Sequence, residues 1–346
     1  MKTEALAGRI AARLTEATGQ PVAVTALTPL SGGACQENFR VELDLAGERR
    51  VTCLRSDART ALPASVGRAV EYAVIEAAVA AGVPTPAARW PSPGLIRDGA
   101  DAYFLDWLDG DAIGARVTRH ASLAAARDKL PEQLARALAA IHRITPATHP
   151  ALPITRAPFS GDGDPADGAI RFVAEMLDRL DAPRPASEYA LRWLRAHKPP
   201  PGDVTLVHAD FRTGNFMVDR DGLVGVLDWE FTHWGDPIED IGWLMTRDWR
   251  FGQDDKPIGG LCGRRRFFAA YTEASGRVVD PARARWWEIC GNLRWGVAAA
   301  FQGRRYAEGE PEFELLAIPR RAAEMEYEAL RLIELAERGG PDAGRP

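Results

Sequence analysis

The sequence predicts an α+β protein of two lobes, with a β-rich N-terminal part and a mainly helical remainder. Its 346 residues exceed one average domain and leave room for a cleft between two packed parts. Short β-prone runs separated by turn residues crowd into the first hundred positions. After residue 112 the pattern changes to alanine-, leucine- and arginine-rich segments with helical spacing, which indicates a second, helical lobe.

The N-terminal part begins with a helix and continues as a strand meander. Residues 3–18 have amphipathic helical spacing, and Gly19-Gln20-Pro21 ends that helix because it lowers helix propensity and removes a backbone donor. A second helix is expected over 68–81, where apolar residues share one face until Gly82 and Pro84 stop it. The expected strands cover residues 22–30, 37–45, 49–55 and 102–108.

The shift in composition also predicts where the lobes divide. The break Asp109-Gly110-Asp111 follows the last of these strands and is the candidate hinge. The chain ends in a glycine- and proline-rich tail, for which we expect disorder. The predicted division is an N-terminal nucleotide-binding lobe at 1–105, a hinge at 106–111, a helical catalytic lobe at 112–338 and a disordered tail at 339–346.

Composition and charge exclude several classes of protein. Hydrophobic residues make up 46% of the chain and charged residues 26%, which is ordinary for a globular protein. The formal net charge of −5, with both signs interspersed, leaves no basic face for a nucleic-acid backbone. No apolar run approaches the roughly 18 residues of a membrane helix, and no signal peptide is visible. The scattered cysteines form no CxxC pair, so we expect reduced thiols in a cytoplasmic protein without nucleic-acid or membrane partners.

Three oxygen-bearing side chains are expected to converge in the second lobe. A short apolar strand at 204–207 delivers Asp210 to its end, where a loop presents it to a cleft. Asn215 follows five residues later, before a hairpin whose Asp221-Gly222 pair is a strong turn signal. Because the hairpin returns the chain, Asp228 is expected to lie close to Asn215.

Phosphoryl transfer uses these residue types. A carboxylate orients and deprotonates the attacking hydroxyl, and oxygen ligands hold Mg²⁺ against the nucleotide phosphates. Asp210 suits the first task as the catalytic base. Asn215 and Asp228 suit the second, because Mg²⁺ prefers oxygen ligands and commonly takes only one or two from the protein. The segment therefore predicts a kinase that uses ATP or GTP with Mg²⁺.

The same segment resembles a known family of phosphotransferases. Its motifs are HADFRTGN, which contains Asp210 and Asn215, and VLDWE, which contains Asp228. They are similar to the catalytic loop and the metal-binding segment of the aminoglycoside phosphotransferase and choline kinase-like family, distant relatives of the protein kinases. The resemblance extends from about Thr28 to Tyr327. It implies a bilobal protein-kinase-like fold and transfer of a nucleotide γ-phosphate to a hydroxyl of a small-molecule acceptor.

The resemblance also assigns nucleotide-binding residues. In the family, a first hairpin loop lies over the phosphates, a cation on the next strand binds them, an acid pairs with that cation, and hinge backbone atoms meet the purine. The cation is often lysine, whereas this chain has arginine, which is longer and planar. The residues at these positions are Ser31, Gly32 and Gly33 in the loop, Arg55 as the cation, Glu71 as the acid, and Asp106 and Leu108 at the hinge.

Residues beside the motifs have a structural and a functional interpretation. The resemblance implies that His208 supports the catalytic loop by hydrogen bonding and that Asp240 holds the loop from below, whereas Asp240 alone could be a helix N-cap. Glu230 is either a solvated acid or a helper of the metal or acceptor. We expect four tryptophans to lie in the core and not in an acceptor pocket. They are Trp229, Trp234, Trp243 and Trp249.

Two other functions stay open at this point. A transition-metal site of a hydrolase could be formed by His208, Asp210, Asp228 and His233, although it leaves Asn215 and the β-rich lobe without a role. A kinase-shaped protein could also bind nucleotide without consuming it.

The charge pattern after the metal-binding segment bears on the acceptor. A polycationic acceptor needs several carboxylates that nearby bases do not match. Between residues 236 and 294, acids and arginines are mixed without an acidic excess. We therefore expect a neutral or anionic hydroxylated acceptor, with an arginine able to bind a carboxylate.

Overall fold

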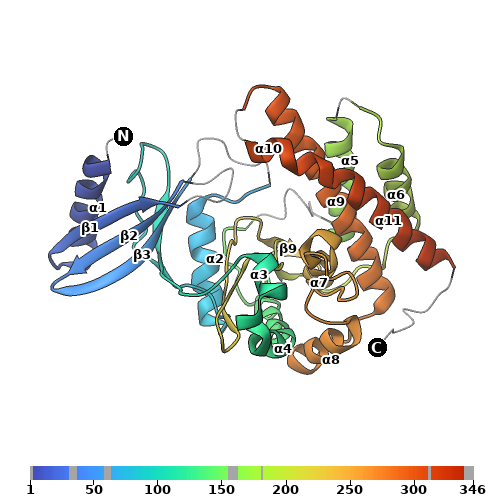
Figure 1. Cartoon of the computed structure of the whole chain (residues 1–346), viewed down its shortest axis with the longest axis horizontal. Coiled ribbons are helices and arrows are strands. Elements are labelled where there is room, and N and C mark those ends of the chain that lie inside the picture. The colour runs from blue at the N-terminus through green and yellow to red at the C-terminus, as the bar shows by residue number, and fades with distance from the viewer. Residues whose placement is uncertain are drawn as a thin grey trace.

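A computed structural model shows an α+β protein of two lobes (Figure 1). A β-sheet with two helices forms one lobe, and the other lobe is mainly helical (Figure 1). The predicted fold class is confirmed. The predicted phosphate loop of Ser31, Gly32 and Gly33 and the predicted tail lie outside the described residues. The described residues are 3–30, 37–57, 64–154, 163–180, 182–310 and 313–338.

The first lobe contains a five-stranded antiparallel sheet. Its strands lie in the order β1-β2-β3-β5-β4. Ala46 and Gly47 form the two-residue turn between β2 and β3 with φ of 51° and 92°, the backbone that a tight hairpin requires. The strands are β1 (Val22–Pro29), β2 (Glu37–Leu45), β3 (Glu48–Ser56), β4 (Ala88–Arg89) and β5 (Ala102–Asp106).

Two helices cover opposite faces of this sheet. Helix α1 (Thr3–Thr18) packs on the face that carries Phe104, in a small core of its own. Helix α2 (Arg68–Ala80) packs on the face that carries Tyr103 and Leu105, because neighbouring strand residues point to opposite sides. The core beneath α2 continues into the helical lobe, so α2 ties the sheet to the rest of the molecule.

Several helices of the second lobe pack against α9 (Pro281–Ala307) (Figure 1). Two short ladders, β6 with β9 and β7 with β8, carry the segment that the sequence singles out. The ladder strands are β6 (Thr205–Val207), β7 (Phe216–Val218), β8 (Leu223–Val226) and β9 (His233–Gly235). The other helices are α3 (Gly114–Arg119), η1 (Ala121–Leu123), α4 (Ala124–Ile141), α5 (Pro165–Asp178), α6 (Pro185–Ala196), α7 (Pro237–Met245), η2 (Arg247–Arg250), α8 (Arg264–Ser275), α10 (Phe313–Ala317), η3 (Ile318–Arg320) and α11 (Arg321–Glu337).

The predicted elements are present, with small shifts at their ends. The helix expected at 3–18 and the strand expected at 37–45 have these bounds. The strand expected to reach Leu108 ends at Asp106, because its ladder with β3 ends at the pair of Thr52 and Asp106. Trp107 and Leu108 therefore leave the sheet where the chain passes to the second lobe. Among the described helices, none is both long enough and apolar enough to cross a lipid bilayer.

Candidate active site

The loop after β6 carries Asp210 and is held from below by a buried carboxylate. Asp240 of α7 accepts hydrogen bonds from the backbone nitrogens of His208, at 2.8 Å, and Ala209, at 2.7 Å. These bonds stabilise an unusual backbone, since Ala209 has a φ of 62°. The N-cap of α7 is Asp236, whose side chain accepts from Ile238, so the N-cap interpretation of Asp240 is wrong and its contacts are those implied by the resemblance.

Two residues that sequence reasoning missed extend this support. His142, at the end of α4, contacts Asp240 at 3.2 Å through Nε2 and the Tyr271 hydroxyl at 2.7 Å through Nδ1. Burial alone would raise the pKa of Asp240, but the hydrogen bond of His142 and the contacts of His208 outweigh it and lower the pKa. Asp240 therefore stays ionised beneath the loop. No local motif could have found Tyr271, because it comes from α8.

His208 is hydrogen-bonded both within the loop after β6 and to the hairpin. Its Nδ1 accepts a hydrogen bond from the backbone nitrogen of Asp210 at 3.3 Å, and its Nε2 donates to the carbonyl of Leu227 at 3.1 Å. Burial lowers the pKa of His208, which keeps the ring neutral and suits one accepting and one donating nitrogen. The second bond joins the catalytic loop to the end of the β7–β8 hairpin.

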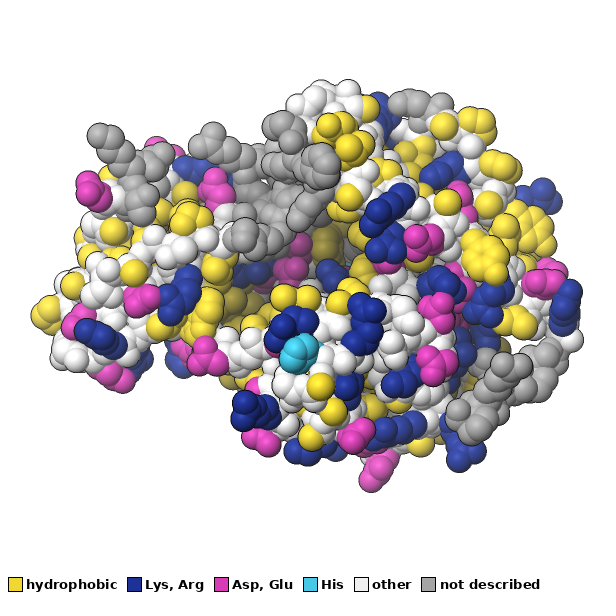
Figure 2. Space-filling model, in the orientation of Figure 1, with side chains coloured by type: hydrophobic (Ala, Val, Ile, Leu, Met, Phe, Trp, Pro, Cys, Tyr) yellow, Lys and Arg dark blue, Asp and Glu magenta, His cyan; other side chains and the backbone are white. Residues whose placement is uncertain are grey.

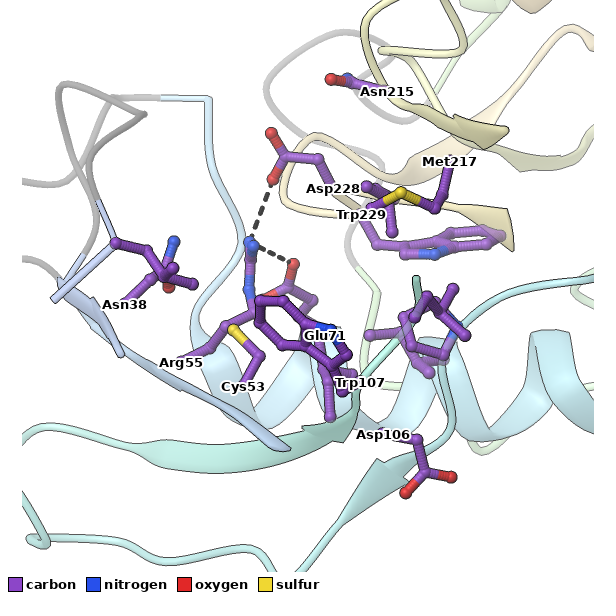
Figure 3. A pocket seen from close by; sticks show the side chains of 16 residues that line it. Asn38, Cys53, Arg55, Glu71, Asp106, Trp107, Asn215, Met217, Asp228 and Trp229 are labelled. Carbon is purple, nitrogen blue, oxygen red and sulfur yellow. Dashed lines mark hydrogen bonds and ion pairs between the residues drawn. The ribbon is translucent and has the colours of Figure 1, made fainter. Parts of the chain in front are cut away.

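The hairpin brings Asp210, Asn215 and Asp228 to one place. Asn215 donates its amide nitrogen to the Asp210 carbonyl at 3.0 Å and to Asp210 Oδ2 at 2.6 Å. The carbonyl of Asn215 accepts from Leu227 at 2.8 Å, so the residue before Asp228 is fixed to it. Asp228 has a φ of 69°, which turns its carboxylate out of the hairpin and toward the pocket (Figure 3).

A cation and an acid from the first lobe meet this group. Nη2 of Arg55 lies 2.9 Å from Glu71 Oε1 and 3.0 Å from Asp228 Oδ1 (Figure 3). The predicted pair of Arg55 and Glu71 is therefore present. The contact with Asp228 was not foreseen, and the length and forked shape of arginine make it possible.

Arg68 and Glu230 form a second link between the lobes that the sequence did not reveal. Nη1 of Arg68 bonds to Glu71, and its Nη2 lies 3.3 Å from Glu230 Oε2. The Glu230 carbonyl also accepts from the backbone of Val66 at 2.7 Å. Glu230 is 7% exposed, so its interpretation as a solvated acid is wrong. Arg68 stands three residues before Glu71 on α2, and that spacing was the available signal.

A pocket of about 270 Å³ lies between the lobes, in the hollow that Figure 2 shows. Arg55, Glu71, Asn215 and Asp228 stand at its polar part, and apolar side chains make up most of the rest. The side chain of Asp106 points away from the pocket and pairs with Arg89 at 2.9 Å, so only its backbone faces inward (Figure 3). The remaining lining residues are Leu30, Asn38, Cys53, Ile75, Pro86, Leu105, Trp107, Leu108, Met217, Leu227 and Trp229.

Comparison with known proteins agrees with this arrangement. The profile of the family described as "Phosphotransferase enzyme family" matches residues 26–287. The chain belongs to this phosphotransferase family.

Solved structures share the protein-kinase-like fold at low sequence identity. A candidate aminoglycoside phosphotransferase of Ralstonia eutropha JMP134 has a TM-score of 0.72 and 18% identity over 94% of this chain and 98% of that chain. A choline/ethanolamine kinase family protein of Mesorhizobium loti has a TM-score of 0.62 and 19% identity over 96% of this chain and 95% of that chain. An aminoglycoside phosphotransferase in a ternary complex with AMP-PNP and hygromycin B has a TM-score of 0.59 and 20% identity over 94% of this chain and 98% of that chain.

A longer protein also contains a related segment. Mouse acyl-CoA dehydrogenase family member 10 is 24% identical over 208 residues. The match covers 57% of this chain and 18% of the mouse protein. The likeness is therefore to one part of that protein.

The hydrolase hypothesis does not fit the histidines of this phosphotransferase. His233 pairs with Glu239 at 3.2 Å, and both ring nitrogens of His208 are bonded within the loop and hairpin. Among the described residues, no three His, Cys, Asp or Glu side chains are grouped as metal ligands. His208, Asp210, Asp228 and His233 therefore do not form the transition-metal site of the hydrolase hypothesis within the described part of the chain.

The tryptophans are buried, as expected, yet one of them touches the predicted base. Trp243 is 7% exposed, and its Nε1 donates to Asp210 Oδ1 at 2.8 Å. The same oxygen accepts from Arg212 Nε at 2.9 Å. Neither Asp210 nor Arg212 is among the residues that line the pocket, so these contacts lie outside its lining. The sequence indicated neither contact, and Trp243 reaches Asp210 from α7.

Proposed function

We propose that this phosphotransferase moves the γ-phosphate of ATP or GTP to a hydroxyl of a small molecule, with Asp210 as the catalytic base. One arrangement carries the proposal: Asp210, Asn215 and Asp228 lie together beside a pocket that also holds the pair of Arg55 and Glu71. Phosphoryl transfer depends on positioning and on stabilising charge, and these side chains supply both.

The hydrogen bonds of Asp210 orient its carboxylate and leave one lone-pair site open. A carboxylate offers about four lone-pair sites. Trp243 and Arg212 occupy two of them on Oδ1, and Asn215 occupies one on Oδ2. Within the described part of the chain no other donor reaches Oδ2, which leaves one site there for the hydroxyl of an acceptor. The three donors fix the direction of the carboxylate, which a general base requires.

Asn215 and Asp228 suit a Mg²⁺ site. Asn215 uses its amide nitrogen on Asp210, which leaves its oxygen for a metal. The side chain of Asp228 is 27% exposed and lines the pocket. Mg²⁺ bound to these oxygens would neutralise charge on the triphosphate. Arg55, which contacts Asp228 directly, is placed to turn its guanidinium toward the same phosphates.

The co-substrate and acceptor are proposed by class. The ternary complex of the related fold with AMP-PNP and hygromycin B supports a nucleotide and a small-molecule acceptor together. Recognition of the purine by hinge backbone at Asp106 and Leu108 would suit either ATP or GTP. The free thiols of Cys53, Cys262 and Cys290 suit a reducing compartment, and we place the protein in the cytoplasm.

The metal and nucleotide requirement tests this function. Purified full-length protein is incubated with ATP or GTP, a panel of hydroxylated metabolites, and Mg²⁺, Zn²⁺ or no metal. The proposal predicts acceptor-dependent release of nucleoside diphosphate with Mg²⁺. Binding of Mg²⁺-nucleotide without consumption would support a non-catalytic binder, and metal-dependent hydrolysis without nucleotide would support a hydrolase.

A further inference from the structure

Arg212 lies beside the predicted base with part of its guanidinium uncommitted. Its Nε bonds to Asp210 Oδ1 at 2.9 Å, and its Nη1 lies 3.5 Å from the carbonyl of Thr213. Its Nη2 makes no hydrogen bond within the described part of the chain, and 24% of the side chain is exposed. A charged donor is therefore available next to the carboxylate that would receive the acceptor hydroxyl.

A tryptophan ring and the loop backbone pack against the guanidinium of Arg212. It lies over the ring of Trp249, with Cζ 4.4 Å from the ring centroid. The loop also passes close by: a Cβ added to Gly214 would lie 2.6 Å from Nη1 of Arg212, and Gly214 has a φ of 113°. Glycine at this position thus leaves the room that Arg212 occupies.

The tryptophans around Arg212 do not form a cage for a cation. Trp243, Trp249 and Trp295 stand in a row, with ring centroids 5.5 Å and 5.1 Å apart. Arg212 covers a face of Trp249, and Arg294 covers a face of Trp243 at 4.1 Å. A quaternary ammonium group binds such faces, and here arginines of this chain occupy them.

Three acids of this region are engaged by donors of this chain. Glu239 pairs with Arg294 at 2.6 Å, and Asp254 pairs with Arg247 at 2.6 Å. Asp248 accepts from Trp295 at 2.7 Å and lies 3.3 Å from Arg321. A polycationic acceptor would have to break these pairs, whereas an anion would meet Arg212 directly.

We propose that Arg212 binds an anionic group of the acceptor, and that the acceptor is a short hydroxy acid carrying a carboxylate or a phosphate. The inference rests on the proposed function, because it places the hydroxyl at Asp210. Two donors of a guanidinium match two oxygens of such an anion. Arg212 also bonds to Asp210. An acceptor whose anionic group binds the outer edge of the Arg212 guanidinium therefore has its neighbouring hydroxyl close to Oδ2 of Asp210.

Matched acceptors test the role of Arg212. Phosphorylation by the full chain with Mg²⁺ and ATP or GTP is measured for glycerate against glyceramide, for 3-hydroxybutyrate against its amide, and for kanamycin and choline. We expect kcat/KM to favour the acid over its amide by about 10- to 100-fold. Arg212→Gln should reduce that ratio to near one, and Arg212→Lys should restore part of it. Arg220→Gln, which changes an exposed arginine of the hairpin turn, should leave the ratio unchanged.

The outcomes separate this inference from the proposed function. Equal losses for acid and amide in Arg212→Gln would overturn the inference, because Arg212 would then serve the nucleotide or the loop itself. A wild-type preference for kanamycin or choline would also overturn it, and both results would leave the kinase activity standing. If Mg²⁺-nucleotide binds but no compound of the panel consumes it, the proposed function fails, and the inference fails with it.

Discussion

The two sides of the loop after β6, which we propose to bind the nucleotide and the acceptor, are built in different ways. On the nucleotide side, Asn215 and Asp228 come from one loop and hairpin, and Arg55 and Glu71 come from a strand and the helix that follows it. On the acceptor side, Arg212 lies over Trp249 of η2, and Asp210 accepts a hydrogen bond from Trp243 of α7. Short stretches of sequence therefore specify the nucleotide side, whereas packing between distant segments specifies the acceptor side.

If the nucleotide side and the acceptor side meet at Asp210, a substitution of Asp210 should have the largest effect on turnover. Asp210→Asn should lower turnover by about 10²- to 10⁴-fold, because the acceptor hydroxyl loses its proton acceptor. Product formation under saturating nucleotide measures this. Asp219→Asn, at the exposed hairpin turn, is the matched control. Turnover of Asp210→Asn within a few-fold of wild type would remove Asp210 from the mechanism.

The scaffold behind the acceptor side should be sensitive to acid. Burial alone would raise the pKa of Glu328 on α11, but the hydrogen bond from Arg331 and the charges of Arg250, Arg331 and Arg247 lower it to about 2. The pKa lies below its usual 4.5, so ionised Glu328 stabilises the fold above pH 4.5. That stabilisation, about 3 kcal/mol, is lost as the pH falls from 4.5 toward 2.

The loss of this stabilisation can be tested by urea unfolding of wild type and Glu328→Gln. The free energy of unfolding is measured from pH 7 to pH 3.5, roughly the range of carboxylate titration. The free energy of unfolding of wild type should exceed that of Glu328→Gln by the largest amount at neutral pH. This difference should become smaller below the usual pKa of a glutamate. Glu334→Gln, at an exposed position of the same helix, should show no such narrowing. If the free energies of unfolding of wild type and Glu328→Gln change in parallel with pH, ionised Glu328 does not stabilise the fold.

The nucleotide side can be tested apart from catalysis. Asp228→Ala should weaken binding of Mg²⁺-nucleotide by at least about tenfold, because the triphosphate loses a carboxylate-bound metal. Calorimetric titrations with Mg²⁺ and with EDTA separate the metal from the nucleotide, and the difference from wild type should disappear in EDTA. Unchanged affinity with Mg²⁺ would refute the assignment of Asp228.

Loss of the acid that orients Arg55 should have a smaller effect. Glu71→Gln leaves Arg55 and Arg68 without their shared carboxylate, so we expect turnover to fall by about tenfold through misplacement of Arg55. Glu76→Gln changes an exposed glutamate of the same helix and should be silent. Equal kinetics for the two variants would show that the Arg55–Glu71 pair has no part in turnover.

The sequence predicted the fold class and the convergence of Asp210, Asn215 and Asp228, because turn chemistry and motif spacing act over a few residues. It missed the bond from Trp243 to Asp210 and the link between Arg68 and Glu230, which join residues 33 and 162 positions apart. It also misjudged Asp240 as a possible cap, since the neighbouring Asp236 fills that position. The lobe boundaries and the phosphate loop stay predictions.

The most direct test is to observe the transferred phosphate. Full-length protein is incubated with Mg²⁺, ATP or GTP, and the panel of hydroxy acids and amides, and the products are followed by phosphorus NMR. If Asp210 is the catalytic base, wild type should form a new phosphomonoester of an alcohol and Asp210→Asn should form none. If the γ-phosphate appears only as inorganic phosphate, or both proteins form the ester equally, the account is contradicted.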